Sequence, residues 1–349
     1  MRVLKVGYKT DILSLNMRQL EKELEELNCK KFRAKQIYQW LHVKLVNSFD
    51  EMTNLPCDLR VALKNKYDIS PLTLVKKLES KEDGTVKFLF KLRDGNVIES
   101  VLMTYEHGNS VCISSQVGCM MGCKFCASAI GGLIRNLTVS EMLSQVYYIK
   151  KVSGKRVSNV VVMGTGEPLD NYPNFLSFVK MITDESGLNI SQRNLTVSTC
   201  GIIPSIIELA KEKLQITLAL SLHGATQEKR ESLMPIAKRY PLEELLFACD
   251  YYYNKTKRRI TFEYNIIAGV NDTDEDANEL AKLLADWNCH LNLIPYNTVD
   301  IYSFRRPEQK SVNIFKNKLE KNGINVTIRR EMGTDIDGAC GQLRRGSLE

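Results

Sequence analysis

Residues 118–128 read GCMMGCKFCAS and place three cysteines, Cys119, Cys123 and Cys126, in the spacing C-x3-C-x2-C. Thiolates are the usual protein ligands of iron–sulfur clusters, and a four-iron cluster normally takes four of them. With only three cysteines close together, one iron stays open to another ligand. Gly118 and Gly122 suit a loop that wraps closely around an inorganic cube. The stretch therefore predicts a [4Fe–4S] cluster held by three cysteines.

The open iron of such a cluster can chelate the amino and carboxylate groups of S-adenosylmethionine (SAM). An electron from the cluster would then break a carbon–sulfur bond and release a 5′-deoxyadenosyl radical. The alternatives are a structural zinc site and a chance cluster of buried thiols. Zinc usually takes paired C-x-x-C knuckles or cysteines with histidines at set spacing. The sequence has one C-x-x-C and no histidine at such spacing, so the pattern favours iron–sulfur chemistry.

Composition sets wider limits on the class of protein. The chain has 349 residues, of which 44% are hydrophobic and 26% are charged, as in ordinary globular proteins. No apolar run reaches the roughly 18 to 20 residues that cross a bilayer, and the first residues lack the apolar core of a signal peptide. We therefore expect a cytoplasmic protein with no membrane partner. Its ten cysteines then indicate metal binding or catalysis rather than a disulfide framework, and its net charge of +7 permits a nucleic-acid partner.

The predicted elements indicate an α/β fold. Apolar residues at three- and four-residue spacing predict helices over 17–27, 34–41 and 59–66, and residues 86–103 predict a hairpin around Arg93-Asp94-Gly95. Further helices are expected after the capping box of Thr138 and Glu141 and over 276–287. Strands that alternate with helices are expected over 110–115, 159–163, 194–198, 215–221, 260–267 and 290–294. This alternation favours parallel strands in a barrel, a partial barrel or an open sheet.

Unusual residues follow the ends of these strands. The cysteine cluster follows the first strand, and GTGEP (164–168) follows the second. Polar segments also close the third, fourth and sixth strands: Ser198-Thr199, Ser221-Leu222-His223 and Pro295-Tyr296-Asn297. In barrel-type folds the loops after the strands converge on one face, where active sites lie. The pattern predicts one shared site, although GTGEP alone is more typical of an ordinary turn and His223 alone of an ordinary core or surface histidine.

Long strings along the chain resemble the RlmN/Cfr family of radical SAM methyltransferases, which act on adenosine in RNA. The resemblance covers nearly the whole chain and rests on CISSQVGCMMGCKFCAS, NLTVSE, GTGEPLDN, STCGIIPSI, LALSLHGAT, LMPI, GVND, NLIPYN and DIDGACGQL, in that order. It implies a partial (β/α)6 radical SAM barrel with a small helical N-terminal domain and a β-hairpin extension. The implied divisions are an RNA-binding accessory domain over 1–75, a linker and hairpin over 76–109, the barrel over 110–300, and a C-terminal helix, strand and cysteine loop over 301–349.

The sequence looks closer to the RlmN branch, which methylates C2 of adenine, than to the Cfr branch, which methylates C8. It has proline at Pro168, where the Cfr branch tends to carry alanine. The resemblance implies 23S ribosomal RNA at the peptidyl-transferase centre and tRNA beside the anticodon as substrates. It also implies an electron donor such as flavodoxin or ferredoxin, and we expect a monomer.

The resemblance further implies a mechanism that consumes two SAM molecules per turnover. Cys340 would take a methyl group from one SAM. The radical from a second SAM would remove hydrogen from that methyl group, whose carbon would then add to the adenine ring. Glu99 would remove the ring proton, and Cys112 would release the product by attacking the Cys340 sulfur, leaving a disulfide to be reduced. The implied SAM-binding residues are Gly166, Glu167, Ser198, Ser221, Leu222, His223 and Asn297.

Other features leave alternatives open. The segment 30–44, KKFRAKQIYQWLHVK, is either an RNA contact or a solvated basic face over an aromatic core stripe. Basic residues near the C-terminus either bind RNA phosphates or are scattered surface charge: Arg305, Arg306, Arg329, Arg330, Arg344 and Arg345. The remaining cysteines are interpreted as structural thiols: Cys29, Cys57, Cys200, Cys249 and Cys289. Competing functions are C8 methylation, a radical SAM enzyme with a small-molecule substrate, and a non-catalytic zinc or iron–sulfur module that binds RNA.

Overall fold

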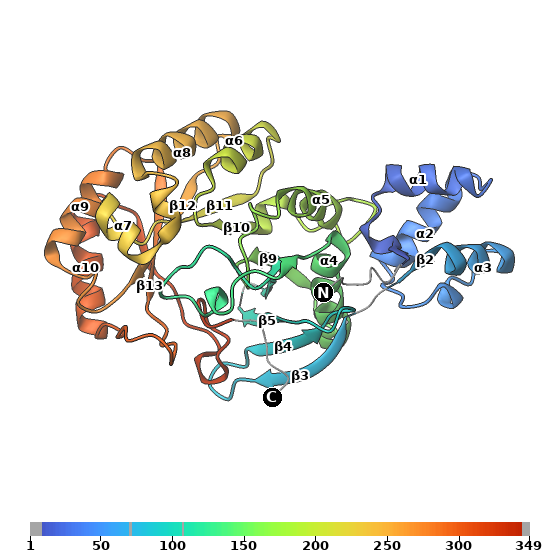
Figure 1. Cartoon of the computed structure of the whole chain (residues 1–349), viewed down its shortest axis with the longest axis horizontal. Coiled ribbons are helices and arrows are strands. Elements are labelled where there is room, and N and C mark those ends of the chain that lie inside the picture. Colours follow the sequence, from blue (N-terminus) through green and yellow to red (C-terminus); the bar gives the residue numbers. More distant parts are fainter. Residues whose placement is uncertain (1–8, 70–71, 107, 344–349) are drawn as a thin grey trace, which may run out of the picture.

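The computed structural model describes residues 9–69, 72–106 and 108–343. A curved sheet with helices on its outer face makes up most of the molecule, and the N-terminal helices lie at the other end of the long axis (Figure 1). The predicted α/β architecture is confirmed. Within the described residues no helix is both long and apolar enough to cross a membrane.

The sheet has ten strands in the order β14-β13-β12-β11-β10-β9-β6-β5-β4-β3. All neighbouring strands from β6 to β14 in this order are parallel. Because β14 and β3 are edges that do not pair with each other, the curved sheet is an open, partial barrel. The parallel strands are β6 (Gly108–Cys112), β9 (Val157–Val162), β10 (Leu195–Thr199), β11 (Thr217–Ser221), β12 (Ile260–Ile266), β13 (Cys289–Pro295) and β14 (Val326–Ile328).

Helices connect the parallel strands on the outside of the sheet (Figure 1). They are α4 (Val139–Ser153), α5 (Tyr172–Ile182), α6 (Ile203–Lys211), α7 (Gln227–Leu233), α8 (Leu242–Thr256), α9 (Asp274–Leu284) and α10 (Gln309–Lys321). The capping box of Thr138 and Glu141 begins α4 as predicted. The bounds predicted for the helix at 276–287 are wrong by two or three residues, because Thr273 accepts from the backbone N–H of Asp276 and begins α9 earlier.

An antiparallel extension continues the sheet beyond β6. The predicted hairpin is present as β4 (Val86–Lys91) and β5 (Val97–Tyr105). A third strand, β3 (Thr73–Glu79), pairs with β4 and crosses the boundary predicted between the helical domain and the linker. β5 pairs with β6 so that Val101 lies opposite Cys112. Because side chains alternate along a strand, Glu99 lies on the same face as Cys112.

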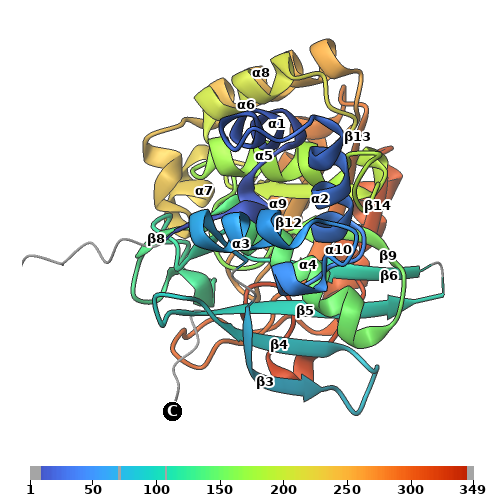
Figure 2. The ribbon, with the colours of Figure 1, turned by 90° about the vertical axis from the view of Figure 1, so that its right-hand side faces the viewer.

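The N-terminal helices are α1 (Met17–Glu26), α2 (Phe32–His42) and α3 (Cys57–Lys66), tied together by the short strands β1 (Thr10–Asp11) and β2 (Tyr67–Asp68). They lie in front of α4 in Figure 2. The contact with α4 includes a hydrogen bond from the Ser140 hydroxyl to Asp11, at 2.6 Å. It also includes a 2.8 Å hydrogen bond between His42 Nδ1 and the Tyr147 hydroxyl, both of which are buried. In α2 Tyr38 is buried, so part of the basic segment does cover an aromatic core.

The inside of the partial barrel is polar. Alternate residues of β10 to β13 face inward, and among them Ser198, Ser221, Glu263 and Asn265 line one cavity, whereas Thr196 and Asn292 line a hollow at the opposite end of the strands. A closed eight-stranded barrel fills its interior with branched apolar side chains. A polar, open interior instead leaves room for ligands with polar groups.

Candidate active site

The cysteine loop is closed at its base by a short antiparallel ladder. β7 (Gln116–Val117) pairs with β8 (Arg135–Asn136), so residues 118–134 project as one loop. Gly118 has a φ of 78°, and a Cβ there would lie 1.9 Å from the carbonyl oxygen of Gly132. A side chain at this position would therefore prevent the loop from closing on itself.

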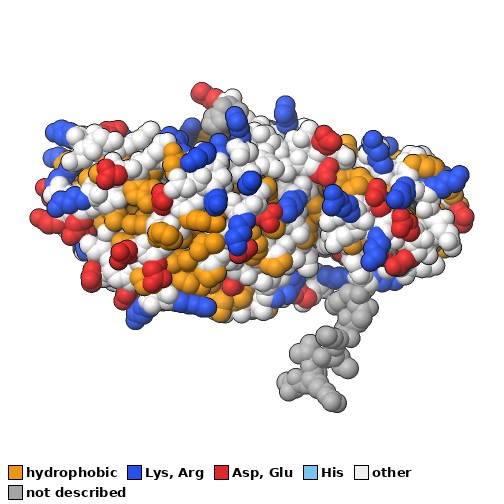
Figure 3. All heavy atoms as spheres, turned by 90° about the horizontal axis from the view of Figure 1, so that it is seen from above, with side chains coloured by type: hydrophobic (Ala, Val, Ile, Leu, Met, Phe, Trp, Pro, Cys, Tyr) orange, Lys and Arg blue, Asp and Glu red, His pale blue; other side chains and the backbone are white. Residues whose placement is uncertain are grey.

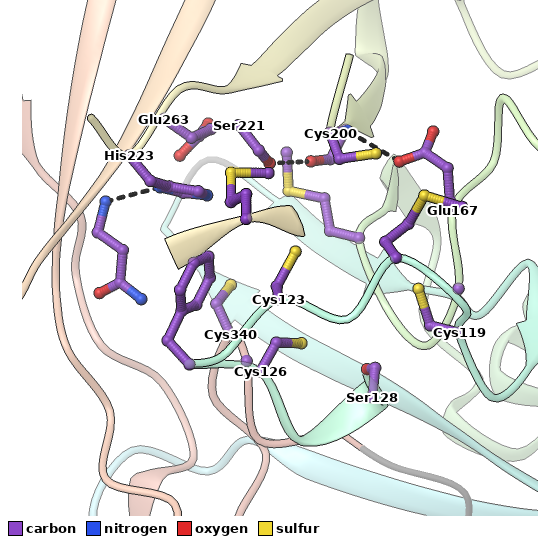
Figure 4. A pocket seen from close by; sticks show the side chains of 18 of the residues that line it. Cys119, Cys123, Cys126, Ser128, Glu167, Cys200, Ser221, His223, Glu263 and Cys340 are labelled. Carbon is purple, nitrogen blue, oxygen red and sulfur yellow. Dashed lines mark hydrogen bonds between the residues drawn. The ribbon is translucent and has the colours of Figure 1, made fainter. Parts of the chain in front are cut away.

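All three cysteines of this loop line one cavity of about 150 Å³ at the carboxyl ends of the strands. In Figure 4 Cys119, Cys123, Cys126 and Cys340 lie on one side, with Glu167, Ser221, His223 and Glu263 across from them. Gly166 and Ser198 line the same cavity. The structure thus brings together nine of the thirteen residues singled out from the sequence, which are Cys119, Cys123, Cys126, Cys340, Gly166, Glu167, Ser198, Ser221 and His223.

The chemistry of the three thiols suits a strongly cationic ligand. Burial raises the pKa of Cys119 to about 12, and burial together with the other two cysteines raises the pKa of Cys123 further above its usual range. Three thiolates could therefore persist here only beside compensating positive charge, which cluster irons provide. Within the described residues, the side chains as placed form no group of three that would bind a single metal ion. A four-iron cube needs only one sulfur on each of three irons, and the donor set fits it.

Glu167 joins two of the strand-end loops. One carboxylate oxygen accepts from the backbone N–H of Leu169 at 3.0 Å, and the other accepts from that of Cys200 at 2.8 Å. Burial raises the pKa of Glu167, and these two donors oppose the rise. The carboxylate is thus positioned on the cavity wall, where it can still accept from a cationic amine.

His223 is held as one neutral tautomer. Its Nδ1 accepts from the backbone N–H of Asn265 at 2.9 Å, so the proton of the neutral ring lies on Nε2. Burial and the nearby Arg230 guanidinium lower the pKa of His223 to about 3. Its ring packs edge-on against Phe125, with centroids 4.8 Å apart. The imidazole can therefore serve as a hydrogen-bond donor in the cavity but not as a cation.

Arg230 of α7 fixes the strand ends from behind. Its fully buried guanidinium donates to the carbonyl oxygens of Ser221, Leu222 and Cys200 at 2.6, 2.7 and 2.5 Å. The carboxyl ends of β10 and β11 are thus held side by side. Leu222, predicted to bind SAM, has a fully buried side chain that does not line this cavity.

A second, narrower cavity of about 30 Å³ adjoins the first. Both are lined by Cys340, Met163, Ile294 and Arg329, and the second also contains Cys112 and Asn297. Burial raises the pKa of the Cys112 thiol to about 12, and Cys340 adds to the rise. All ten cysteines of the chain are free thiols, so Cys112 and Cys340 form no disulfide in this structure.

The loop that carries Cys340 is anchored to three remote segments. From the antiparallel extension, the Lys87 ammonium donates to the Asp337 carbonyl at 3.1 Å. From the cysteine loop, the Ser128 hydroxyl donates to the Leu343 carbonyl at 2.6 Å. From the segment after β13, the Asn297 amide donates to the Cys340 carbonyl at 2.9 Å. Asn297, predicted to bind SAM, thus holds the Cys340 backbone.

Glu99 lies on the Cys112 face of β5 but lines neither cavity. The Glu99 residue is only 4% exposed. Its carboxylate oxygen Oε1 lies 3.5 Å from Nζ of Lys87 and forms an ion pair with it. Because Lys87 also bonds to Asp337, the C-terminal loop covers this pair.

Glu263 was not singled out from the sequence, and Arg329 was expected on the surface. The Arg329 guanidinium lies 3.5 Å from the Glu263 carboxylate and lines both cavities, so it is not a surface phosphate contact. The negative charge of a Cys340 thiolate, followed by that of Glu263, raises the Arg329 pKa. The sequence did offer a signal for Glu263: it is a charged residue within the predicted strand ITFEYNI, and strands buried on both faces rarely carry a charge.

The other uncertain residues divide between the site and the surface. Cys200 is buried and lines the first cavity beside Glu167, and its interpretation as a structural thiol stays a prediction. Cys57 is exposed at the start of α3. Arg305 and Arg330 are exposed, and Arg306 pairs with Glu331. Arg344 and Arg345 lie outside the described residues.

Family models match both parts of the chain. Residues 113–284 match the radical SAM superfamily. Residues 10–69 match the ribosomal RNA large subunit methyltransferase N-terminal domain. The first range runs from the end of β6 to the end of α9 and so covers most of the barrel, and the second covers the N-terminal helices.

Relatives match over nearly the full length. A protein of Lachnoclostridium phytofermentans named "Probable dual-specificity RNA methyltransferase RlmN" is 58% identical over 97% of this chain and 95% of its own length. A protein of the same name from Lachnospira eligens is 58% identical over 97% of each chain. The crystal structure of a radical SAM methyltransferase from Sphaerobacter thermophilus matches with a TM-score of 0.92 at 43% identity, over 96% of this chain and 99% of that one. The chain therefore belongs to the RlmN family within the radical SAM superfamily.

Proposed function

We propose that this chain is a radical SAM methyltransferase that methylates C2 of an adenosine in 23S ribosomal RNA, at the peptidyl-transferase centre, and in tRNA, beside the anticodon. The observation that carries the proposal is the position of Cys340, which lines both the cavity of Cys119, Cys123 and Cys126 and the cavity of Cys112. The dual-specificity RNA methyltransferase name of the relatives supports this substrate class.

Two groups would occupy the first cavity. Cys119, Cys123 and Cys126 would hold a [4Fe–4S] cluster, and SAM would lie against Gly166, Glu167, Ser198, Ser221 and His223. When bound, these groups supply a transferable methyl group and a 5′-deoxyadenosyl radical. Glu167 would accept from the methionyl ammonium, and His223 Nε2 would donate one hydrogen bond, because its Nδ1 already accepts from Asn265.

Cys340 would be the nucleophile that takes up the methyl group. A thiolate attacks an alkyl carbon far better than a thiol does. The Arg329 guanidinium lines both of the cavities that Cys340 lines, so a positive charge would lie beside the attacking group. The Asn297 amide would keep the Cys340 backbone in place during attack.

Cys112 would release the methylated base by attacking the Cys340 sulfur. The new sulfur–sulfur bond would form as the bond between Cys340 and the transferred carbon breaks; that carbon would keep the electron pair and take up the proton lost by Cys112, which completes the methyl group. An external thiol or electron donor must then reduce the disulfide. Glu99 would accept the ring proton. Its pairing with Lys87 beneath the C-terminal loop means that this role requires the loop to move when RNA binds.

The remaining parts have supporting roles in this proposal. The N-terminal domain would contact RNA through α2 and the residues that follow it, where the Lys44 ammonium lies 3.4 Å from the Trp40 ring centroid and the Arg33 guanidinium lies near the exposed Phe32 ring. The enzyme would act as a cytoplasmic monomer. Reduction of the cluster requires a separate one-electron donor.

Product analysis tests the proposal. The protein is reconstituted anaerobically with iron and sulfide, incubated with SAM, dithionite and either a 23S rRNA fragment or tRNA, and the digested nucleosides are measured by mass spectrometry. We expect 2-methyladenosine from both RNAs. Cys340→Ala should abolish it, whereas Cys57→Ala, an exposed cysteine remote from both cavities, should not.

Each other outcome has a defined meaning. Formation of 8-methyladenosine would place the chain with the C8-methylating branch. Release of 5′-deoxyadenosine without any methylated nucleoside would favour a small-molecule substrate. A loaded cluster that cleaves no SAM would rule out the radical mechanism and leave an RNA-binding module.

A further inference from the structure

A groove of about 610 Å³ runs along the outer side of the cysteine loop. It is bounded by Met120 and Met121 of the loop, by Tyr172 at the start of α5, by Pro204 of α6 and by Tyr240 after the 3-10 helix η5 (Pro235–Lys238). Met121 also lines the cavity of the three cysteines. The chain between Cys119 and Cys123 therefore forms a wall with the cluster site on one side and the groove on the other.

The groove is mainly apolar and open to solvent. Met120 is 61% exposed, although it immediately follows a predicted cluster ligand. Figure 3, which views the molecule from the side of α6 and α8, shows hydrophobic side chains exposed together over the barrel half, with charged side chains of both signs among them. Contiguous exposed apolar surface of this kind is typical of protein contacts.

The unpaired charges around the groove are mostly positive, because Glu212 and Glu208, which lie near Tyr172, pair with Lys180 and Lys211. Arg239 lines it, and Lys238 and Lys124 are exposed beside it; Lys124 is tied to this region by its backbone N–H, which donates to the Leu233 carbonyl at 3.0 Å. None of these three cations forms an ion pair with another described residue. The only acid among the lining residues is Asp170, whose carboxylate accepts from the Gln116 amide at 2.8 Å.

We propose that this groove is the docking surface for an acidic one-electron-transfer protein that reduces the cluster. The inference rests on the proposed function, since it requires a cluster on the three cysteines. One electron would pass from the partner's reduced flavin or iron–sulfur group to the cluster, so the partner is oxidised, the cluster is reduced, and no covalent bond changes. Because Met121 lines both the cavity of the three cysteines and the groove, only the short loop through Met120 and Met121 would separate a partner in the groove from the cysteines.

The substrate RNA and the donor would then approach from different sides. Cys112 and Cys340, which must meet the adenine, lie in the second cavity, and the groove contains neither. An apolar groove with a few rim cations suits a protein with acidic edges better than a phosphate backbone. Redox partners typically form small interfaces, below about 1,200 Å², which permit fast exchange.

Two substitutions test the docking surface. Met120→Glu and Arg239→Glu each place negative charge on the groove, and Ile314→Glu, at a residue 53% exposed on α10, is the matched control. Binding of a purified bacterial flavodoxin is measured by isothermal titration calorimetry with the cluster-free and the cluster-loaded protein. We expect both groove variants to weaken binding at least tenfold and the control to change it less than twofold. Wild-type affinity should also fall with added salt.

Reduction experiments separate docking from catalysis. Stopped-flow bleaching of the cluster by reduced flavodoxin should slow at least tenfold in both groove variants. Formation of 5′-deoxyadenosine driven by dithionite, a small reductant that needs no docking surface, should stay within twofold of wild type in Arg239→Glu, whose position lies outside the cysteine loop. Unchanged flavodoxin affinity in both variants would overturn the inference, as would a loss of affinity for the 23S rRNA fragment without a loss for flavodoxin. If wild type forms no 5′-deoxyadenosine with dithionite, the proposed function fails, and the binding measurement still decides the docking surface.

Discussion

The two cavities that meet at Cys340 are assembled in different ways. The first is lined mainly by segments at the carboxyl ends of consecutive parallel strands, and the cysteine loop and the turn after β9 contribute most of its residues. The second takes Met103 and Tyr105 from β5, Cys112 from β6, Asn297 from the segment after β13, and Cys340 from the C-terminal loop. The first is therefore a product of the barrel itself, whereas the second exists only when a remote loop is anchored over it.

This difference predicts how each cavity responds to perturbation. The walls of the first are strand ends whose backbone groups are bonded within the sheet and to buried Arg230. The position of Cys340 depends on hydrogen bonds to Lys87, Ser128 and Asn297, which come from segments remote from it in sequence. Substitution of Arg230, behind the first cavity, should lower the free energy of unfolding. Substitutions around the second cavity should change the reactivity of Cys340.

The largest expected effect separates the two cavities by their cysteines. Cys119→Ala should abolish cluster assembly, 5′-deoxyadenosine formation and methylation together. Cys340→Ala and Cys112→Ala should keep iron and sulfide content while eliminating free methylated RNA. For Cys112→Ala we expect RNA to remain attached to Cys340, because no thiol releases it; denaturing electrophoresis and iron analysis measure both effects. Loss of the cluster in Cys340→Ala would show that the two cavities are not independent.

The next effect concerns the strand ends of the first cavity. Arg230→Met removes the donor to three buried carbonyls while keeping the side-chain volume, and should lower the free energy of unfolding by about 3 kcal/mol. Urea denaturation measures the change. Arg230→Lys, which keeps the charge but cannot reach all three oxygens, should recover only part of the loss. A change below about 1 kcal/mol in Arg230→Met would contradict the role given to this residue.

A third region, the contact of the N-terminal helices with α4, sharpens the comparison because it contributes to neither cavity. Burial lowers the pKa of His42 to about 3. The ordinary value is about 6.5, so the unfolded chain binds the proton more readily and stability falls as pH drops from about 6.5 towards 3. Between pH 7.5 and 5 the loss should be about 2 kcal/mol, and His42→Phe should lose less over the same range.

Thermal unfolding across this pH range measures the histidine effect. His42→Phe has no titrating group at this position, and the stability of each protein is compared with its own value at pH 7.5. Parallel pH profiles of wild type and His42→Phe would show that the histidine does not control acid sensitivity.

The smallest effect concerns the anchoring of Cys340. Asn297→Ala removes one hydrogen bond to the Cys340 carbonyl, worth about 1 kcal/mol, and should speed alkylation of Cys340 by roughly fivefold. Asn288→Ala, which removes a long hydrogen bond to the Tyr253 hydroxyl on the surface, is the control. Iodoacetamide labelling followed by peptide mass spectrometry gives both rates. Equal rates in Asn297→Ala and wild type would mean that other contacts alone hold the loop.

Much of the first cavity could be predicted because its residues are grouped in the sequence. Cys119, Cys123 and Cys126 are near neighbours, and Glu167, Ser198 and His223 each lie at or just after the end of a strand that hydrophobic patterning identifies. The strand bounds were right to within a few residues, and β3 was missed because its exposed, lysine-rich pattern resembles a linker. Pairing with β4 stabilises that strand despite its sequence.

The second cavity could not be derived from local pattern. Cys112 and Cys340 are separated by most of the barrel, and only the resemblance singled them out. Arg329 looked like surface charge, yet it is held inside by Glu263, which belongs to a different strand. Glu99 was named for proton transfer, and the structure places it in an ion pair with Lys87 under the C-terminal loop.

The sequence by itself determined the cysteine loop, the order of strands and helices, and the family, because each depends on residues close together in the chain or on periodic burial. Only the tertiary structure decided that Cys340 lies between the cluster site and Cys112, that Arg230 fixes the strand ends, and that the cysteine loop separates the cluster site from an exposed groove. The physical reason is that these arrangements depend on hydrogen bonds and packing between segments far apart in sequence. No local propensity or spacing records such contacts.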